Sequence, residues 1–179
     1  MRTAHPRDSG LRESVPAART GERAPGGAQR AGVTELDAIC RGAEGAEPDV
    51  ASEVFAGTAG QVRAVRVFVR DVLAGHAAVD DAVLVASELA TNAVAHSFSG
   101  LEGGRFAVHV AGLSPDLAAV VVTDQGAAGG PCIGGLDQEA ESGRGLAVVR
   151  SVSSELVVAG GDGGPRSVLA VIPARPPGR

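Results

Sequence analysis

The sequence predicts an α+β fold, a two-layer sandwich in which a mixed, largely antiparallel sheet carries helices on one face. The first observation behind this prediction is the order of patterns along the chain: a strand, two helices, two strands, a loop, a helix and two strands. The second is composition, because 179 residues with 44% hydrophobic and 21% charged side chains are typical of a soluble protein with room for one domain. No internal repeat is visible, so these elements are expected to share one core.

The N-terminal half of this domain is predicted to contain one strand and two helices. Residues 50–56 form a short β-prone run. Thr58 and Gln61 have the spacing of a capping box, and valines recur at helical intervals after them, so a helix is expected over 59–74. Asp80 or Asp81 is expected to cap the next helix, which continues to His96 and ends in the polar, glycine-containing stretch that follows.

The C-terminal half is predicted to contain four strands and one helix. Residues 106–110 and 117–123 are β-rich runs, and the turn residues Ser114-Pro-Asp116 between them indicate an antiparallel pair. The loop from Gln125 to Ser142 has 18 residues, which is long for a compact domain and favours a lid or a binding loop. A helix over 145–154 and a final pair of strands over 155–159 and 167–172 complete the domain.

The ends of the chain lack any apolar period and are expected to be disordered. The domain is therefore assigned to residues 49–174, with tails at 1–48 and 175–179. The first 30 residues carry six Arg and three acidic residues, a net charge of +3, whereas the rest of the chain carries −8. This segment is either a basic arm for an acidic partner or a solvated or misannotated start.

Composition excludes several classes of function. Every basic residue is Arg, so the chain has no amine for a Walker A motif, a eukaryotic-type kinase strand or a Schiff base. Aromatic residues amount to 2%, which argues against a nucleic-acid partner. Two cysteines without a CxxC spacing, and no apolar stretch of membrane-spanning length, favour a cytoplasmic protein without a membrane partner.

The predicted helix that ends at His96 carries one polar stripe. Glu88, Asn92 and His96 follow one another at intervals of four residues, and at about 100° per residue they lie within a sector of about 80°. The other residues between Ala82 and His96 include no charged side chain. A carboxylate buried among apolar residues needs a partner, a metal or a ligand. The alternative is structural, with Glu88 paired to an Arg elsewhere and Asn92 to a backbone group.

Two further motifs could contribute to the same site. Asp124-Gln-Gly126 ends an apolar strand, where a carboxylate can accept a hydrogen bond from an amine such as adenine N6 and glycine lets the ring approach the backbone. Gly143-Arg-Gly-Leu146 precedes an apolar helix, and free backbone N–H groups at a helix start attract phosphate. Taken singly, the first is equally compatible with an ordinary turn and the second with a capping turn.

Together, the three motifs resemble those of the GHKL superfamily of ATPases, and among these the small single-domain anti-sigma-factor serine kinases. The phrase from Ser87 to His96 resembles the N box, Asp124-Gln-Gly126 the first glycine box and Gly143-Arg-Gly-Leu146 the second. The resemblance covers about residues 50–173 and implies the Bergerat-type ATP-binding fold. Two positions depart from the pattern: Ala128 replaces a frequent second glycine, and Arg166-Ser167 replaces a frequent Lys-Thr.

The resemblance implies a role for each motif. Asn92 would coordinate Mg²⁺ at the phosphates of ATP, and Glu88 would act as the general base. Asp124, with Gly126 beside it, would bind adenine. The stretch from 127 to 142 would be the ATP lid.

The second glycine box completes the implied nucleotide site. Gly143, Arg144, Gly145 and Leu146 would hold phosphate through backbone amides. His96 would be structural or lie near the phosphates.

The function implied by this resemblance is that of an ATP-binding regulatory protein. It would be a serine/threonine kinase that phosphorylates a small anti-sigma antagonist and also sequesters a sigma factor. The alternative is a non-catalytic module in a bacterial partner switch that binds its partner according to whether ATP or ADP is bound. Homodimer formation and the identity of the partner are left open.

Overall fold

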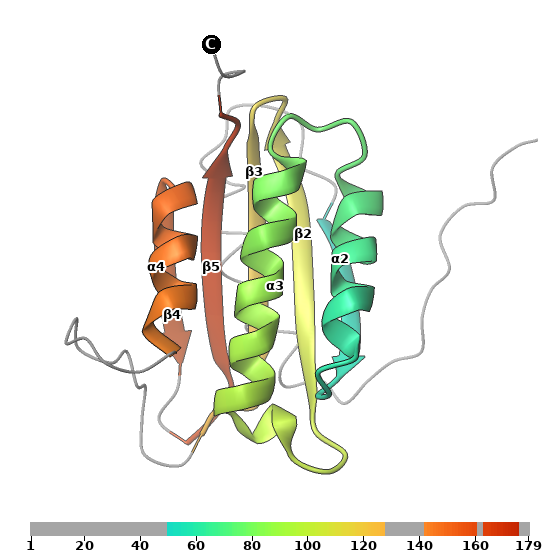
Figure 1. Ribbon diagram of the computed structural model, residues 1–179, viewed down its shortest axis with the longest axis vertical. Coiled ribbons are helices and arrows are strands. Elements are labelled where there is room, and N and C mark those ends of the chain that lie inside the picture. The colour runs from blue at the N-terminus through green and yellow to red at the C-terminus, as the bar shows by residue number, and fades with distance from the viewer. Residues whose placement is uncertain (1–49, 128–141, 161–162, 176–179) are drawn as a thin grey trace, which may run out of the picture.

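The computed structural model describes residues 50–127, 142–160 and 163–175. The strands are β1 (Val50–Ala56), β2 (Arg105–Ser114), β3 (Leu117–Asp124), β4 (Glu155–Gly160) and β5 (Arg166–Pro173), in the spatial order β1-β2-β3-β5-β4 (Figure 1). All four neighbouring pairs in this sheet are antiparallel. The predicted α+β class is confirmed, and the described strands include no parallel pair.

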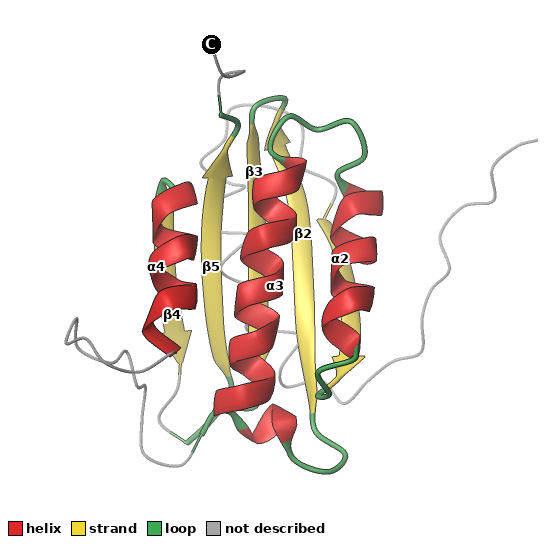
Figure 2. Cartoon of the chain, in the orientation of Figure 1, coloured by secondary structure: helices red, strands yellow, loops and turns green. Residues whose placement is uncertain are grey.

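Three helices form the second layer. They are α2 (Gln61–Val72), α3 (Val79–His96) and α4 (Ser142–Val152), and all lie on the same face of the sheet (Figure 2). A short 3₁₀ turn, η1 (Phe98–Gly100), follows α3. None of the helices in the described ranges has the length and apolar character needed to cross a membrane.

The core lies between the sheet and these helices. Alternate strand residues such as Val108 and Val120 point toward the helices and are fully buried, as are Val65 of α2 and Val85 of α3. Complete burial of such a side chain is worth about 1.5 to 3 kcal/mol. With so few aromatic residues, the core depends mainly on closely packed Val, Ala and Leu.

The helix starts differ from the prediction. Gly60 is the N-cap of α2 and no side chain caps that end, so the capping box expected from Thr58 and Gln61 is wrong. Ala78 is the N-cap of α3, and Asp80 and Asp81 lie inside its first turn, where their charge favours the positive end of the helix dipole without capping it.

The N-terminal end of α3 has no side-chain cap and is instead held by the side chain of His76. Its Nδ1 accepts a hydrogen bond from the Ala78 N–H at 3.0 Å, so Nε2 carries the proton and donates to the Ser114 carbonyl at 2.8 Å. This imidazole ties the start of α3 to the end of β2. The contact joins residues far apart in sequence, which local capping patterns cannot predict.

The remaining boundaries follow the predicted order. The turn after β2 and the last hairpin lie where expected, but α4 begins at Ser142, three residues before the predicted start at 145. The predicted tail at 1–48, residues 176–179 and most of the predicted lid, 128–141, lie outside the described residues.

Candidate nucleotide-binding site

The polar stripe of α3 is built on a helix that is otherwise packed into the core. Glu88 and Asn92 are partly buried, and His96, the last residue of α3, is exposed. Their neighbours Val85 and Leu89 are buried. Within the described ranges no Arg or His forms an ion pair with Glu88. The structural alternative, an Arg partner for Glu88, is therefore not found in this part of the chain.

Asn92 provides an unused polar group at the same place. Its Nδ2 is buried and has no hydrogen-bond partner among the described residues, so the expected backbone partner for this amide is absent there. A buried amide N–H without an acceptor costs about 1 to 3 kcal/mol. A bound ligand oxygen would satisfy Nδ2, while the amide oxygen is a hard donor of the kind that Mg²⁺ prefers.

The start of α4 lies directly against these two side chains. A Cβ added to Gly145 would lie 2.7 Å from Glu88 Oε2 and 4.0 Å from Asn92 Oδ1. Any larger residue at this position would displace the carboxylate. Glu88, Asn92 and Gly145 therefore share one small space between α3 and α4.

The glycine-rich motif lies inside α4 rather than in a loop before it. Gly143, Arg144 and Gly145 belong to its first turn, where backbone N–H groups have no acceptor within the helix. Arg144 is exposed and Leu146 is partly buried. Free backbone N–H groups are thus present at the start of α4, as an anion site would need, and Gly145 lets α4 approach α3.

The end of β3 is held rigidly. Asp124 is buried, with 3% of its surface exposed, and its Oδ1 accepts a hydrogen bond from the Gly126 N–H at 2.7 Å. Gly126 has a φ of +77°, and a Cβ there would collide with the Gly164 carbonyl. The Gly126 carbonyl in turn accepts from the Phe98 N–H at 2.7 Å, which joins this turn to the end of α3.

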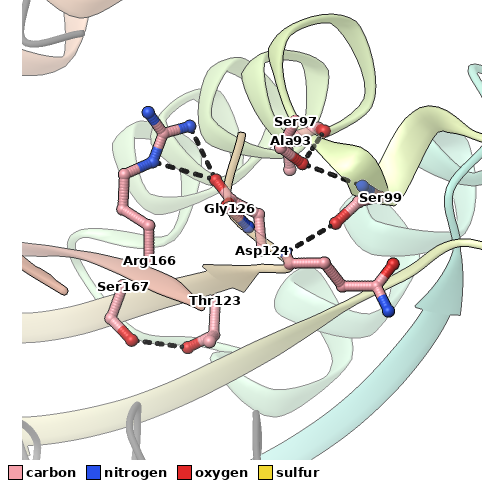
Figure 3. Close-up of polar contacts among 9 residues, drawn as sticks. Ala93, Ser97, Ser99, Thr123, Asp124, Gly126, Arg166 and Ser167 are labelled. Atoms are coloured by element: carbon pink, nitrogen blue, oxygen red, sulfur yellow. Dashed lines mark hydrogen bonds and ion pairs between the residues drawn. The ribbon is translucent and has the colours of Figure 1, made fainter. Parts of the chain in front are cut away.

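Arg166 contacts the candidate site in a way that the sequence did not reveal. Its Nε and Nη2 donate to Asp124 Oδ2 at 3.0 and 2.7 Å (Figure 3), and the two side chains are only 15% and 5% exposed. The β3–β5 register places Asp124 opposite Arg166, and next to them Thr123 and Ser167 share a hydrogen bond of 2.9 Å. The sequence contained one signal, the replacement of a frequent Lys-Thr by Arg166-Ser167, but this signal can be interpreted only when the register of β3 and β5 is known.

The geometry limits what Asp124 can still bind. A carboxylate has about four acceptor positions. Arg166 uses both at Oδ2, and Gly126 uses one at Oδ1. One acceptor position at Oδ1 is left, which matches a single amine hydrogen bond.

Ser99 is a second residue that the sequence analysis missed. It is fully buried after α3, and its Oγ accepts a hydrogen bond from the Gln125 N–H at 3.0 Å (Figure 3). Its own N–H donates to Ser97 Oγ at 3.0 Å. These bonds fix the segment after α3 against the end of β3. The end of α3, the end of β3 and the start of α4 all lie at one end of the molecule, the lower end in Figure 1.

Comparison with known families agrees with this arrangement. A model of the histidine kinase-like ATPase domain matches residues 55–169, which is more than half of the chain. The chain belongs to the histidine kinase-like ATPase family. The match runs from β1 into β5 and so contains all three motifs. No curated protein matches the chain.

Membership of the histidine kinase-like ATPase family implies ATP binding, generally with Mg²⁺. The residues fit such a group, because Asn92 offers an amide oxygen and α4 offers free backbone N–H groups beside it. The described ranges contain no cluster of three His, Cys, Asp or Glu that could bind a metal unaided. A Mg²⁺ ion here would take most of its ligands from phosphate oxygens and water.

Proposed function

We propose that this ATPase domain is a serine/threonine kinase of the anti-sigma-factor type. It transfers the terminal phosphoryl group of ATP to a hydroxyl of a small anti-sigma antagonist protein, and it also sequesters a sigma factor. The observation that carries the proposal is the state of Glu88, a carboxylate on an apolar helix with no cationic partner among the described residues.

The surroundings of Glu88 support a role as general base. Its Oε2 faces the space beside Gly145, next to the N–H groups that begin α4. A carboxylate at this position can hold or accept the proton of an incoming hydroxyl. A site that only binds a nucleotide gains nothing from a negative charge beside phosphate.

The other site residues are proposed to bind and orient the nucleotide. The Asn92 amide oxygen would hold Mg²⁺, and the backbone N–H groups from Gly143 to Leu146 would hold phosphate. Asp124 would accept a hydrogen bond from the adenine amine at the remaining position on Oδ1. Bound Mg²⁺ would supply charge compensation at the phosphates.

A second candidate is a module that binds its partner according to the bound nucleotide and transfers nothing. The observation in its favour is the Arg166–Asp124 ion pair, which occupies Oδ2 of the proposed adenine acceptor. Because Arg166 belongs to β5, a nucleotide that binds Asp124 would also perturb this ion pair and could alter β5. Such a response to the nucleotide would not involve Glu88. Measurement of transfer separates the two candidates.

The test compares Glu88→Gln with wild type in partner phosphorylation and in ATP affinity. The partner is first identified by pull-down with the full chain and phosphosite mapping. A general base contributes to the transition state more than to binding, so Glu88→Gln should keep ATP affinity while phosphotransfer falls about 10²- to 10⁴-fold. Glu102→Gln, at an exposed residue, is the matched control.

The outcomes distinguish the candidates. Asn92→Ala should weaken both affinity and transfer, because it removes the metal ligand. Undiminished transfer by Glu88→Gln would contradict the assigned role. Nucleotide-dependent partner binding without labelling by wild type would favour the binding module.

A further inference from the structure

The side chain of Arg166 lies on the same face of the sheet as the candidate nucleotide site. Asp124 and Arg166 are partners in the β3–β5 register, and the partners two residues further along the strands are Val122 and Val168. These two valines pack in the core between the sheet and the helices. Because side chains two residues apart on a strand point to the same face, Asp124 and Arg166 also face the helical layer.

The position of β5 places Arg166 between the other predicted nucleotide contacts. In Figure 1, β5 lies between α3, which carries Glu88 and Asn92, and α4, which carries Gly145. Arg166 is bound directly to Asp124 by its Nε and Nη2. A ligand that is held by α3 and α4 and reaches Asp124 therefore meets Arg166 as well.

The guanidinium of Arg166 has more donors than its ion pair uses. Arginine carries five N–H groups in one plane. Nε and Nη2 each donate one of them to Asp124 Oδ2, and within the described ranges Arg166 makes no other side-chain hydrogen bond. One N–H on Nη2 and both on Nη1 are left, and Figure 3 shows the third nitrogen, Nη1, pointing away from the carboxylate. These N–H groups are free to bind a ligand.

The edge of an adenine ring presents the matching groups. Its exocyclic amine is a donor, and the ring nitrogens on either side of that amine, N1 and N7, are acceptors. Asp124 Oδ1 is an acceptor with one position left, and the same carboxylate holds the donors of Arg166 next to it. An acceptor and a charged donor thus lie side by side, as an amine and a neighbouring ring nitrogen require.

We propose that Arg166 recognises the base, donating an N–H to the adenine ring nitrogen beside the amine that Asp124 accepts from. This inference rests on adenine binding in the proposed function and adds a second, charged contact to the base. By occupying Oδ2, Arg166 also leaves Oδ1 as the position for the amine, which fixes the orientation of the ring. The planar guanidinium can bind the carboxylate and the base at fixed angles, which the flexible point charge of a lysine cannot do.

The test compares nucleotide analogues on the wild-type full chain by calorimetry. 1-Deaza-ATP and 7-deaza-ATP each replace one ring nitrogen with C–H and keep the amine. We expect one of them to bind about 10- to 150-fold more weakly than ATP, because a hydrogen bond from a charged donor is lost, and the other to bind within about threefold of ATP. Purine riboside triphosphate, which lacks the amine, measures the Asp124 contact separately.

The variant Arg166→Met shows whether the loss belongs to this side chain. Without the guanidinium, ATP and both deaza analogues should bind with affinities within about threefold of one another. The ratio of affinities is compared, so a general weakening of the site does not affect the result. Arg70→Met, at an exposed ion pair, is the control and should keep the wild-type ratio. Should Arg166→Met not fold, the wild-type series decides alone.

Three results would overturn the inference. The first is equal affinity of wild type for ATP and both deaza analogues while purine riboside triphosphate binds more weakly, which keeps Asp124 as the adenine contact and excludes Arg166. The second is a deaza penalty of the same size in Arg166→Met, which assigns the contact to another group. The third is equal binding of all four nucleotides, which overturns adenine recognition by Asp124 as well. Phosphotransfer enters none of these measurements, so the proposed kinase activity stands or fails by its own assay.

Discussion

The ion pair between Arg166 and Asp124 makes a quantitative prediction about stability. Replacing Arg166 with Met removes both hydrogen bonds to Oδ2 and leaves Asp124, whose side chain is 5% exposed, without its counter-charge. Breaking a buried pair in this way costs about 3 to 5 kcal/mol. The Gly126 N–H still compensates Oδ1, and the Arg166 side chain is 15% exposed, so water can partly replace it. We therefore expect a loss of about 2 to 4 kcal/mol in the free energy of unfolding.

Urea unfolding at neutral pH measures this loss, and the chain contains its own control. Arg70 and Asp80 form a pair of 3.4 Å whose side chains are 62% and 90% exposed, so Arg70→Met should change stability by no more than about 0.5 kcal/mol. Adding Asp124→Asn to Arg166→Met should recover much of the loss, because the uncompensated charge disappears. If Arg166→Met costs no more than Arg70→Met, the buried pair does not stabilise the fold and the reasoning fails.

Three further predictions concern the pH response and the site. Because burial lowers the pKa of His109 below 6.5, the unfolded chain takes up the proton first. The contribution of neutral His109 to the free energy of unfolding should be complete above about pH 6.5 and should decline below it by up to about 1.4 kcal/mol per pH unit. In thermal melts, His109→Asn should reduce this pH dependence. Gly145→Ala should lower phosphotransfer because the added Cβ displaces Glu88, while stability should stay unchanged or rise slightly because alanine favours the helix. The control Gly60→Ala, with no atom near its added Cβ, should leave phosphotransfer unaltered. Asp124→Ala should lower ATP affinity about 10- to 150-fold, or about 1.5 to 3 kcal/mol, and wild type should prefer ATP to GTP; equal affinities in calorimetry would contradict adenine recognition.

The fold was predictable because its signals are local. The apolar run of β3 and the single polar stripe of α3 can be read within a few residues, and both elements formed where expected. The partner of Asp124 could not be read in this way, because Arg166 is 42 residues away and meets it only through the β3–β5 register. The contact of Gly145 with Glu88 has the same character, since it depends on how α4 packs against α3. The sequence therefore indicated candidate site residues, whereas the contacts that each of them makes depend on the tertiary structure.

The strand order has a consequence for how the chain acquires its structure during synthesis. β5 follows the other four described strands in the chain, yet it lies between β3 and β4. Until residues 166–173 leave the ribosome, β4 has no neighbour in the described sheet and β3 exposes an unpaired edge that invites pairing with other chains. The same event delivers Arg166 to Asp124. Completion of the sheet and neutralisation of the buried carboxylate are thus one step. A chain that stops before Arg166 should therefore form neither the five-stranded sheet nor a nucleotide site in which Asp124 is paired.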